Sequence, residues 1–187
     1  MKDKGIKEII ITTVSLFLIC AVAAGVLGAV NMITAPAIAD IQQKAADEAK
    51  ANVLPAAVTF NIAAVPDAQA YEGRDAAGAL VGYVFVTSAS SYGGKLELMT
   101  GVDLNGSVTG INILTIDDTP GLGMNAKRDE FRNQYVGKSG ELTVVKGSAS
   151  GDEEIAAITS ATITSKAVTS CVNQALALFA QVAGKEG

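Results

Sequence analysis

The sequence lacks histidine altogether and contains only two cysteines in 187 residues. Without histidine, a Ser–His–Asp triad, a Cys–His pair and a His-bearing zinc site are all excluded. Cys20 lies in an apolar run far from Cys171, so we do not expect a disulfide between them. Two thiolates cannot hold an iron–sulfur cluster alone. Redox chemistry in this chain would therefore require an organic cofactor.

Positive charge is also scarce: the chain has 14 Lys and Arg residues and 19 Asp and Glu residues, for a net charge of −5. No basic patch interleaved with aromatic residues occurs, and tryptophan is absent. Nucleic-acid binding would need clustered Lys and Arg, so that class of function is excluded. Apolar residues make up 49% of the chain and the mean hydropathy is +0.35. These values indicate a membrane segment.

A long apolar run follows the N-terminus, and no charged residue occurs between Glu8 and Asp40. We predict a transmembrane helix over residues 9–33, since about 20 apolar residues suffice to cross a bilayer. Three lysines precede the run, so residues 1–8 are expected in the cytoplasm and the rest of this single-pass protein outside it, at the cell membrane. The alternatives are a cleaved signal peptide, a lipoprotein signal ending at Cys20 and a buried core helix.

The remaining chain divides at Pro55. Residues 34–55 are predicted to be a juxtamembrane helix or linker, with Asp40 as a helix cap and the helix ending before Pro55. Residues 56–187 are predicted to form one α+β domain without internal repeats. Alternating apolar residues predict strands over 80–87, 95–104, 107–116 and 141–146, and helical periodicity predicts helices over 126–135 and 166–182. Asn105-Gly106 predicts a type I′ hairpin turn.

A hydroxyl-rich segment, residues 158–165, runs directly into the last predicted helix. Thr159, Ser160, Thr162 and Thr164 carry hydroxyls, and Ser165 could serve as the helix N-cap. One interpretation is a plain helix start. The other adds a phosphate, because free N–H groups and the positive end of the helix dipole attract an anion.

Two glycine-containing segments are ambiguous when taken alone. Residues 117–123 follow a predicted strand, and their Pro120-Gly121 pair is typical of a turn. The segment is not a dinucleotide fingerprint, because no G-x-G-x-x-G precedes a helix. The second segment, residues 91–94, has small residues that would allow close packing of a flat ring or of another strand.

Taken together and in this order, the segments resemble the G subunit of the Rnf electron-transport complex. The C subunit of the sodium-translocating NADH:quinone reductase is a more distant resemblance. The resemblance covers nearly the whole chain and includes the anchor, residues 92–94, 101–103 and 119–123, Phe131 and Gln134, and the flavinylation-like segment 159–165. Ser160 stands where that family often has glycine. Ala156 stands six positions before Thr162, where that family often has an acidic residue.

The resemblance implies an FMN-binding domain of mixed strands and helices, with FMN bound covalently as a phosphoester on Thr162. The other implied phosphate-side residues are Thr159, Ser160, Ala161, Thr164, Ser165 and Lys166. The implied ring-side residues are Tyr92, Gly93, Thr119, Gly121, Leu122 and Gly123. No metal site and no independent catalytic residue are expected.

The resemblance further implies an electron relay in a membrane-bound, ion-translocating ferredoxin:NAD oxidoreductase complex. Its partners would be the other membrane subunits of that complex, and a separate flavin transferase would attach the flavin. Two alternatives remain open: a C-type subunit of a sodium-translocating NADH:quinone reductase, and a non-redox assembly or sensor subunit. In the second of these the hydroxyl-rich segment would be only a helix cap.

Overall fold

The computed structural model describes residues 2–65 and 68–184, and the chain divides into two compact units between Ala46 and Asp47. One helix, α1 (Lys2–Val53), provides the first unit and the beginning of the second. The predicted end before Pro55 is confirmed. The predicted cap at Asp40 is wrong, because the helix is already continuous there. The helix continues through Pro36, although proline has no N–H to donate to the carbonyl four residues back.

Within α1, residues Thr13–Ala35 are long and apolar enough to cross a membrane, with a mean hydropathy of 2.4 over 23 residues. The side chains of this segment are exposed, whereas those of a core helix would be covered. The segment overlaps the predicted span over residues 9–33. An apolar helix without a protein partner is the form that a membrane anchor takes.

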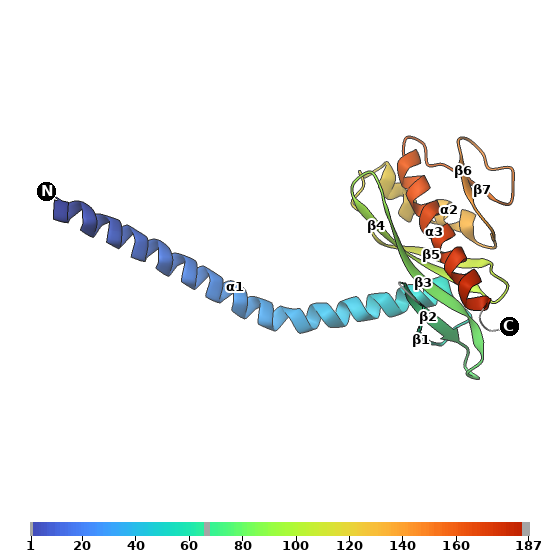
Figure 1. Cartoon of the computed structure of the whole chain (residues 1–187), viewed down its shortest axis with the longest axis horizontal. Helices are drawn as coiled ribbons and strands as arrows, with labels where there is room; N and C mark the ends of the chain where they lie inside the picture. Colours follow the sequence, from blue (N-terminus) through green and yellow to red (C-terminus); the bar gives the residue numbers. More distant parts are fainter. Residues whose placement is uncertain (1, 66–67, 185–187) are drawn as a thin grey trace. The chain divides into compact units, whose positions relative to one another are not determined.

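The second unit is built on a five-stranded antiparallel meander, in which each strand pairs with the next along the chain (Figure 1). Its strands are β1 (Thr59–Ala63), β2 (Gln69–Arg74), β3 (Leu80–Ser90), β4 (Lys95–Asp103) and β5 (Val108–Thr115). Three of the four predicted strands correspond to β3, β4 and β5, while β1 and β2 were not predicted. A separate parallel pair joins β6 (Thr143–Val145), which lies within the predicted strand over 141–146, to β7 (Glu154–Ala156), which was not predicted.

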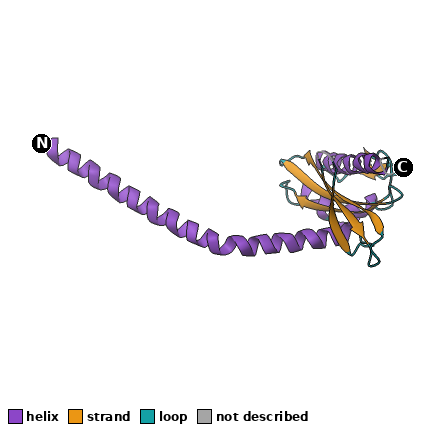
Figure 2. Cartoon of the chain, turned by 60° about the horizontal axis from the view of Figure 1, so that its bottom comes forward, coloured by secondary structure: helices purple, strands orange, loops and turns teal. Residues whose placement is uncertain are grey.

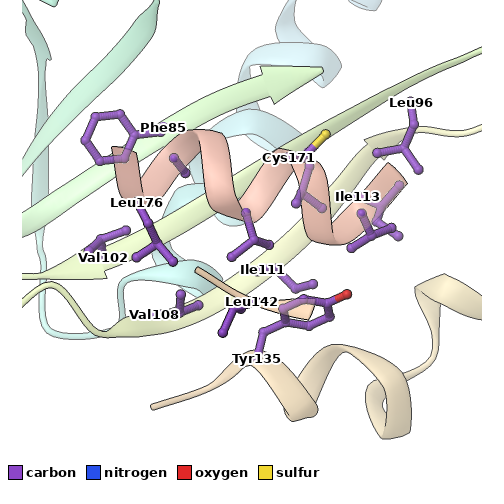
Figure 3. Packing of buried hydrophobic residues seen from close by; sticks show 14 of the residues in the cluster. Phe85, Leu96, Val102, Val108, Ile111, Ile113, Tyr135, Leu142, Cys171 and Leu176 are labelled. Atoms are coloured by element: carbon purple, nitrogen blue, oxygen red, sulfur yellow. The ribbon is translucent and has the colours of Figure 1, made fainter. Parts of the chain in front are cut away.

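Helix α3 (Thr162–Ala183) lies across one face of the sheet (Figure 2) and covers the main hydrophobic core. Alternate residues of β3 and β4, such as Phe85 and Leu98, point to this face because side chains alternate along a strand. Figure 3 shows Leu176 and Cys171 of α3 packed among them. The predicted apolar face of the last helix is confirmed, since the following are buried: Val168, Val172, Ala175, Leu176 and Phe179.

The two cysteines are free, as predicted, and Cys171 is buried in the core. Burial raises the pKa of the Cys171 thiol to about 11, against a smaller lowering effect of the hydrogen-bonding Thr87 side chain. Thr87 Oγ1 also donates to the Cys171 carbonyl oxygen at 3.0 Å, which ties β3 to α3. The thiol therefore stays protonated at neutral pH and contributes packing rather than reactivity.

The opposite face of the sheet receives the end of α1 in a groove formed by two cross-strand glycine pairs. Gly73 pairs with Gly82 on β2 and β3, and Gly101 pairs with Gly110 on β4 and β5. We call these four residues the glycine groove. Leu54 and Val53 fill it, and both are almost fully buried. Thr109 Oγ1 donates a hydrogen bond to the Val53 carbonyl oxygen, so an otherwise free carbonyl of the helix end is satisfied.

Three short helical elements lie between β5 and β6: the 3₁₀ helix η1 (Gly123–Lys127), helix α2 (Asp129–Arg132) and the 3₁₀ helix η2 (Asn133–Tyr135). The single helix predicted over 126–135 is thus split, because Arg128 between the first two pieces is extended. The β4–β5 hairpin is confirmed, but its predicted type I′ turn is wrong. Among described residues only Ser160 combines a side chain with a positive φ, so Asn105 does not adopt the required conformation. Instead, the Asp103 carboxylate accepts the N–H groups of Asn105 and Ser107.

Candidate functional site

The site lies where α3 begins. Thr162 is the first helical residue, and Ala161 precedes it as an N-cap that offers no side-chain hydrogen bond. The predicted cap, Ser165, lies one turn inside the helix instead. Its hydroxyl donates to the Ala161 carbonyl oxygen and accepts the Ile158 N–H, both at 3.0 Å. The hydroxyl thus stabilises the segment that precedes the helix and does not cap the helix N-terminus.

The start of α3 leaves backbone donors free. The first helical bond of this end runs from the Ser165 N–H to the Ala161 carbonyl oxygen, at 3.0 Å. The N–H groups of Thr162, Ile163 and Thr164 come before it and cannot have a partner four residues back. Together with the helix dipole they form a suitable environment for an anion.

A cavity of about 420 Å³ opens at this helix end. Cavities of this size are typical of small-molecule and cofactor sites. Three chain segments line it: residues 160–164, residues 118–119 with 122–123, and Tyr92. We call it the site cavity. Tyr92, Leu122 and Ile163 are exposed at the cavity, so apolar surface flanks the polar helix start.

The second lining segment is a tight turn after β5. The Leu122 N–H donates to the Thr119 carbonyl oxygen at 3.2 Å, and Gly121 between them has a φ of +78°. Proline followed by a glycine with positive φ is the pattern of a type II turn, so the predicted Pro120-Gly121 turn is confirmed. The Asn125 side chain donates to the Gly121 carbonyl oxygen at 2.7 Å and holds the turn against η1.

Asp118 joins the three segments and was not among the predicted site residues. Its carboxylate accepts hydrogen bonds from the Ser91 hydroxyl at 2.6 Å, the Thr164 hydroxyl at 2.5 Å and the Gly93 N–H at 2.6 Å. It is only 3% exposed. Gly123 packs so closely that an added Cβ would lie 2.5 Å from the Asp118 carboxylate. Gly123 therefore leaves room for this carboxylate, whereas Gly93 leaves room for the Asp117 backbone.

The environment of Asp118 has opposing effects on its pKa. Burial raises the pKa, but hydrogen bonds from Ser91, Thr164 and the Gly93 N–H lower it, and the net result is a pKa below the ordinary value. Each of these donors favours the ionised carboxylate. Asp118 is thus a buried anion at neutral pH.

The structure brings most of the predicted cofactor-binding residues to the site cavity. Those that line it are Thr162, Ser160, Ala161, Thr164, Thr119, Leu122, Gly123 and Tyr92. Gly93 and Gly121 belong to the adjoining turns, and Ser165 is buried beneath the helix start. Thr159 is exposed outside the lining. Lys166 lines a different depression, beside Glu141 and Asn173.

Ser160 has a φ of +62°, in the left-handed region that glycine enters without strain. Ser160→Gly is expected to raise the free energy of unfolding by about 1 kcal/mol, because it removes this strain. Urea unfolding of both proteins measures the difference. Ser160→Ala keeps a Cβ and should bring no gain. Equal stabilisation by alanine would contradict the strain explanation.

The other positions named in the resemblance lie outside the cavity lining. Phe131 is buried and contacts Tyr135 edge to face, with ring centroids 5.5 Å apart. The Gln134 side chain accepts the Ala156 N–H at 2.8 Å and also donates to the Ala156 carbonyl oxygen. The backbone at position 156 is therefore held in place whatever side chain it carries.

Comparison with known proteins agrees with this geometry. Residues 91–177 match the FMN-binding domain family. The chain is similar to the G subunit of the Na(+)-translocating ferredoxin:NAD(+) oxidoreductase complex of Acetobacterium woodii, with 38% identity over 88% of each chain. It is also similar to the G subunit of the proton-translocating ferredoxin:NAD(+) oxidoreductase complex of Clostridium ljungdahlii, with 35% identity over 94% of each chain.

Solved structures show the same fold. The NqrC protein of Shewanella oneidensis aligns over 68% of this chain and 71% of its own, with a TM-score of 0.55 and 17% identity. The C subunit of the Na(+)-translocating NADH-quinone reductase from Parabacteroides distasonis aligns over 62% of each chain, with a TM-score of 0.53 and 23% identity. An apolar helix followed by an FMN-binding domain, with 35–38% identity to the two relatives over most of the chain, shows that the protein belongs to the G-subunit family of Rnf-type ion-translocating oxidoreductase complexes.

Proposed function

We propose that this protein carries FMN as a phosphoester on Thr162 and relays electrons within an ion-translocating ferredoxin:NAD(+) oxidoreductase complex. The observation that supports this most is the position of Thr162, which is the first residue of α3 and lines the site cavity. The relatives from the G-subunit family are named as parts of such complexes. When bound, FMN would supply one- and two-electron chemistry that no side chain of this protein offers.

The residues present fit the cofactor. Free N–H groups at the start of α3 would hold a phosphate that is joined to Thr162. Tyr92 and Leu122 offer apolar surface to a flat ring. A covalent bond would also keep the site filled where free FMN is lost by diffusion, so it suits a domain outside the cytoplasm.

Attachment would need a separate enzyme. A threonine hydroxyl is a weak nucleophile unless a base removes its proton, and the sequence has no histidine. Asp118 is a poor base because hydrogen bonds hold its pKa low. The Thr162 hydroxyl would form its ester bond to the flavin-side phosphorus of FAD as the bond to AMP breaks. Its proton would pass to a base of the flavin transferase.

The anchor sets the proposed topology. Lysines precede the apolar segment, so the N-terminus would lie in the cytoplasm and the FMN-binding domain outside it. No Asp or Glu occurs in Thr13–Ala35. An ion path normally needs such groups, and it would therefore run through the other membrane subunits.

Replacing Thr162 with valine tests the proposal. The wild-type chain from its native host should give a band on a denaturing gel that fluoresces under ultraviolet light, whereas Thr162→Val should give none. Valine keeps the shape of the side chain but removes the hydroxyl that forms the ester. Thr162→Ser should keep some fluorescence because it retains a hydroxyl.

Thr59→Val is the matched control, since Thr59 is exposed on β1, outside both the site cavity and the flavinylation-like segment, and its loss should leave the fluorescence unchanged. Fluorescence that persists in Thr162→Val would exclude this attachment site. A dark wild-type band in a host with an active flavin transferase would instead favour a non-redox assembly or sensor subunit.

A further inference from the structure

Asp118 holds a position that the attachment of FMN does not explain. Of the described residues that line the site cavity, it alone carries a formal charge. It is 3% exposed, so water screens this charge poorly. A group bound in the cavity would therefore lie close to a buried negative charge.

The charge of Asp118 is stabilised without being neutralised. Its three donors are the hydroxyls of Ser91 and Thr164 and the N–H of Gly93, all of them uncharged. In the described part of the chain, the ion pairs of Lys and Arg involve other carboxylates. The negative field of Asp118 therefore reaches the cavity.

The same contacts leave the helix start available. None of the three donors to Asp118 is a free N–H group of α3, so the carboxylate and a phosphate would use different partners. Asp118 also places an anion beside the first turn of α3, which has no acidic residue of its own. This arrangement is favourable with the helix dipole.

We propose that the fixed negative charge of Asp118 keeps the reduction potential of FMN in this site low. The inference rests on the proposed function. Electrons arriving from the redox partners in the complex add negative charge to the flavin until protons from solvent follow. A buried carboxylate opposes that added charge, and the oxidised flavin is favoured.

Asp118→Asn is the variant that removes the charge with the least change in shape. Its amide oxygen can accept the Gly93 N–H, and its NH₂ group can donate to the Ser91 and Thr164 hydroxyl oxygens. All three contacts can thus persist, and we expect the variant to fold and to take up flavin.

The experiment compares midpoint potentials of the full-length, flavin-loaded proteins by spectroelectrochemical titration. Asp118→Asn should be shifted toward positive potential. Asp117→Asn is the matched charge control, since Asp117 is exposed outside the cavity lining and its loss should shift the potential much less. Ser91→Ala removes a hydrogen bond to Asp118 but keeps the charge, so its potential should stay close to that of the wild type.

Equal shifts in Asp118→Asn and Asp117→Asn would overturn the proposal, as would an equal shift in Ser91→Ala. If Asp118→Asn takes up little flavin, Asp118→Ser and Asp118→Glu provide a second test. Flavin in Asp118→Glu, but in neither Asp118→Asn nor Asp118→Ser, would show that the carboxylate is needed to form the site. It would overturn the proposal that Asp118 sets the reduction potential. Failure of the proposed function is separate, because the wild-type chain would then carry no flavin.

Discussion

Adding one methyl group at position 101 is expected to lower the free energy of unfolding by about 3 kcal/mol, the upper part of the range for overpacked sites. A Cβ on Gly101 would overlap the Val53 carbonyl oxygen and would lie 2.6 Å from Thr109 Oγ1. These atoms belong to the helix end and to its capping hydrogen bond. The clash would push the end of α1 out of the glycine groove and expose Val53 and Leu54.

The measurement is thermal and urea unfolding of full-length Gly101→Ala in detergent, with limited proteolysis near residue 54 as a second readout. Gly151→Ala is the control, because its added Cβ would meet nothing closer than 3.5 Å. It should leave both readouts near those of the wild type. A Gly101→Ala protein as stable as this control would show that the helix end does not depend on the groove.

Gly93→Ala is expected to disrupt the site cavity and to abolish most flavin attachment. A Cβ on Gly93 would overlap the backbone of Asp117, with its carbonyl carbon at 2.5 Å and the Asp118 nitrogen at 2.9 Å. Backbone cannot move aside as the tip of a long side chain can. The 91–94 turn would separate from Asp118 and break the Gly93 N–H hydrogen bond to its carboxylate.

The readouts are gel fluorescence for attached flavin and urea unfolding for stability, with an expected loss of about 2–3 kcal/mol. Ser91→Ala removes a neighbouring hydrogen bond to the same carboxylate without any clash, and it should cost about 1 kcal/mol while flavin is retained. Normal flavin content in Gly93→Ala would mean that the 91–94 turn can move without affecting the attachment site.

The strand and helix periodicities predicted the centre of the domain well. In β3 the apolar residues are spaced so that Phe85 and Val84 enter different cores on the two faces, and the pattern is visible in the sequence. In the edge strand β1 the alternation over Thr59–Ile62 does not correspond to burial, because Ile62 is 85% exposed and β1 pairs on one side only among the described strands. Its strand state depends on pairing with β2, which is a tertiary effect.

The site shows the same limit. A hydroxyl-rich helix start predicts a cap, but local sequence cannot show that Ser165 lies inside the helix. Two consecutive acids precede the Thr119–Pro120 turn, and nothing local distinguishes exposed Asp117 from buried Asp118. Only contacts distant in sequence do so, from Ser91 and Gly93 earlier in the chain and from Thr164, 46 residues later. In the sequence, the only indication that Asp118 belongs to the site is this pair of acidic residues next to the turn.

The glycine groove also sets an order of events during synthesis. Val53 leaves the ribosome well before the residues that will hold it, since its hydrogen-bond partner Thr109 is 56 residues further along the chain. The groove does not exist until β2, β3, β4 and β5 have paired. Contacts so distant in sequence form late, after loop closure has been overcome. The apolar helix is thus made first, but the C-terminal end of α1 docks only after the strands have paired. Until then Leu54 is accessible to chaperones or proteases.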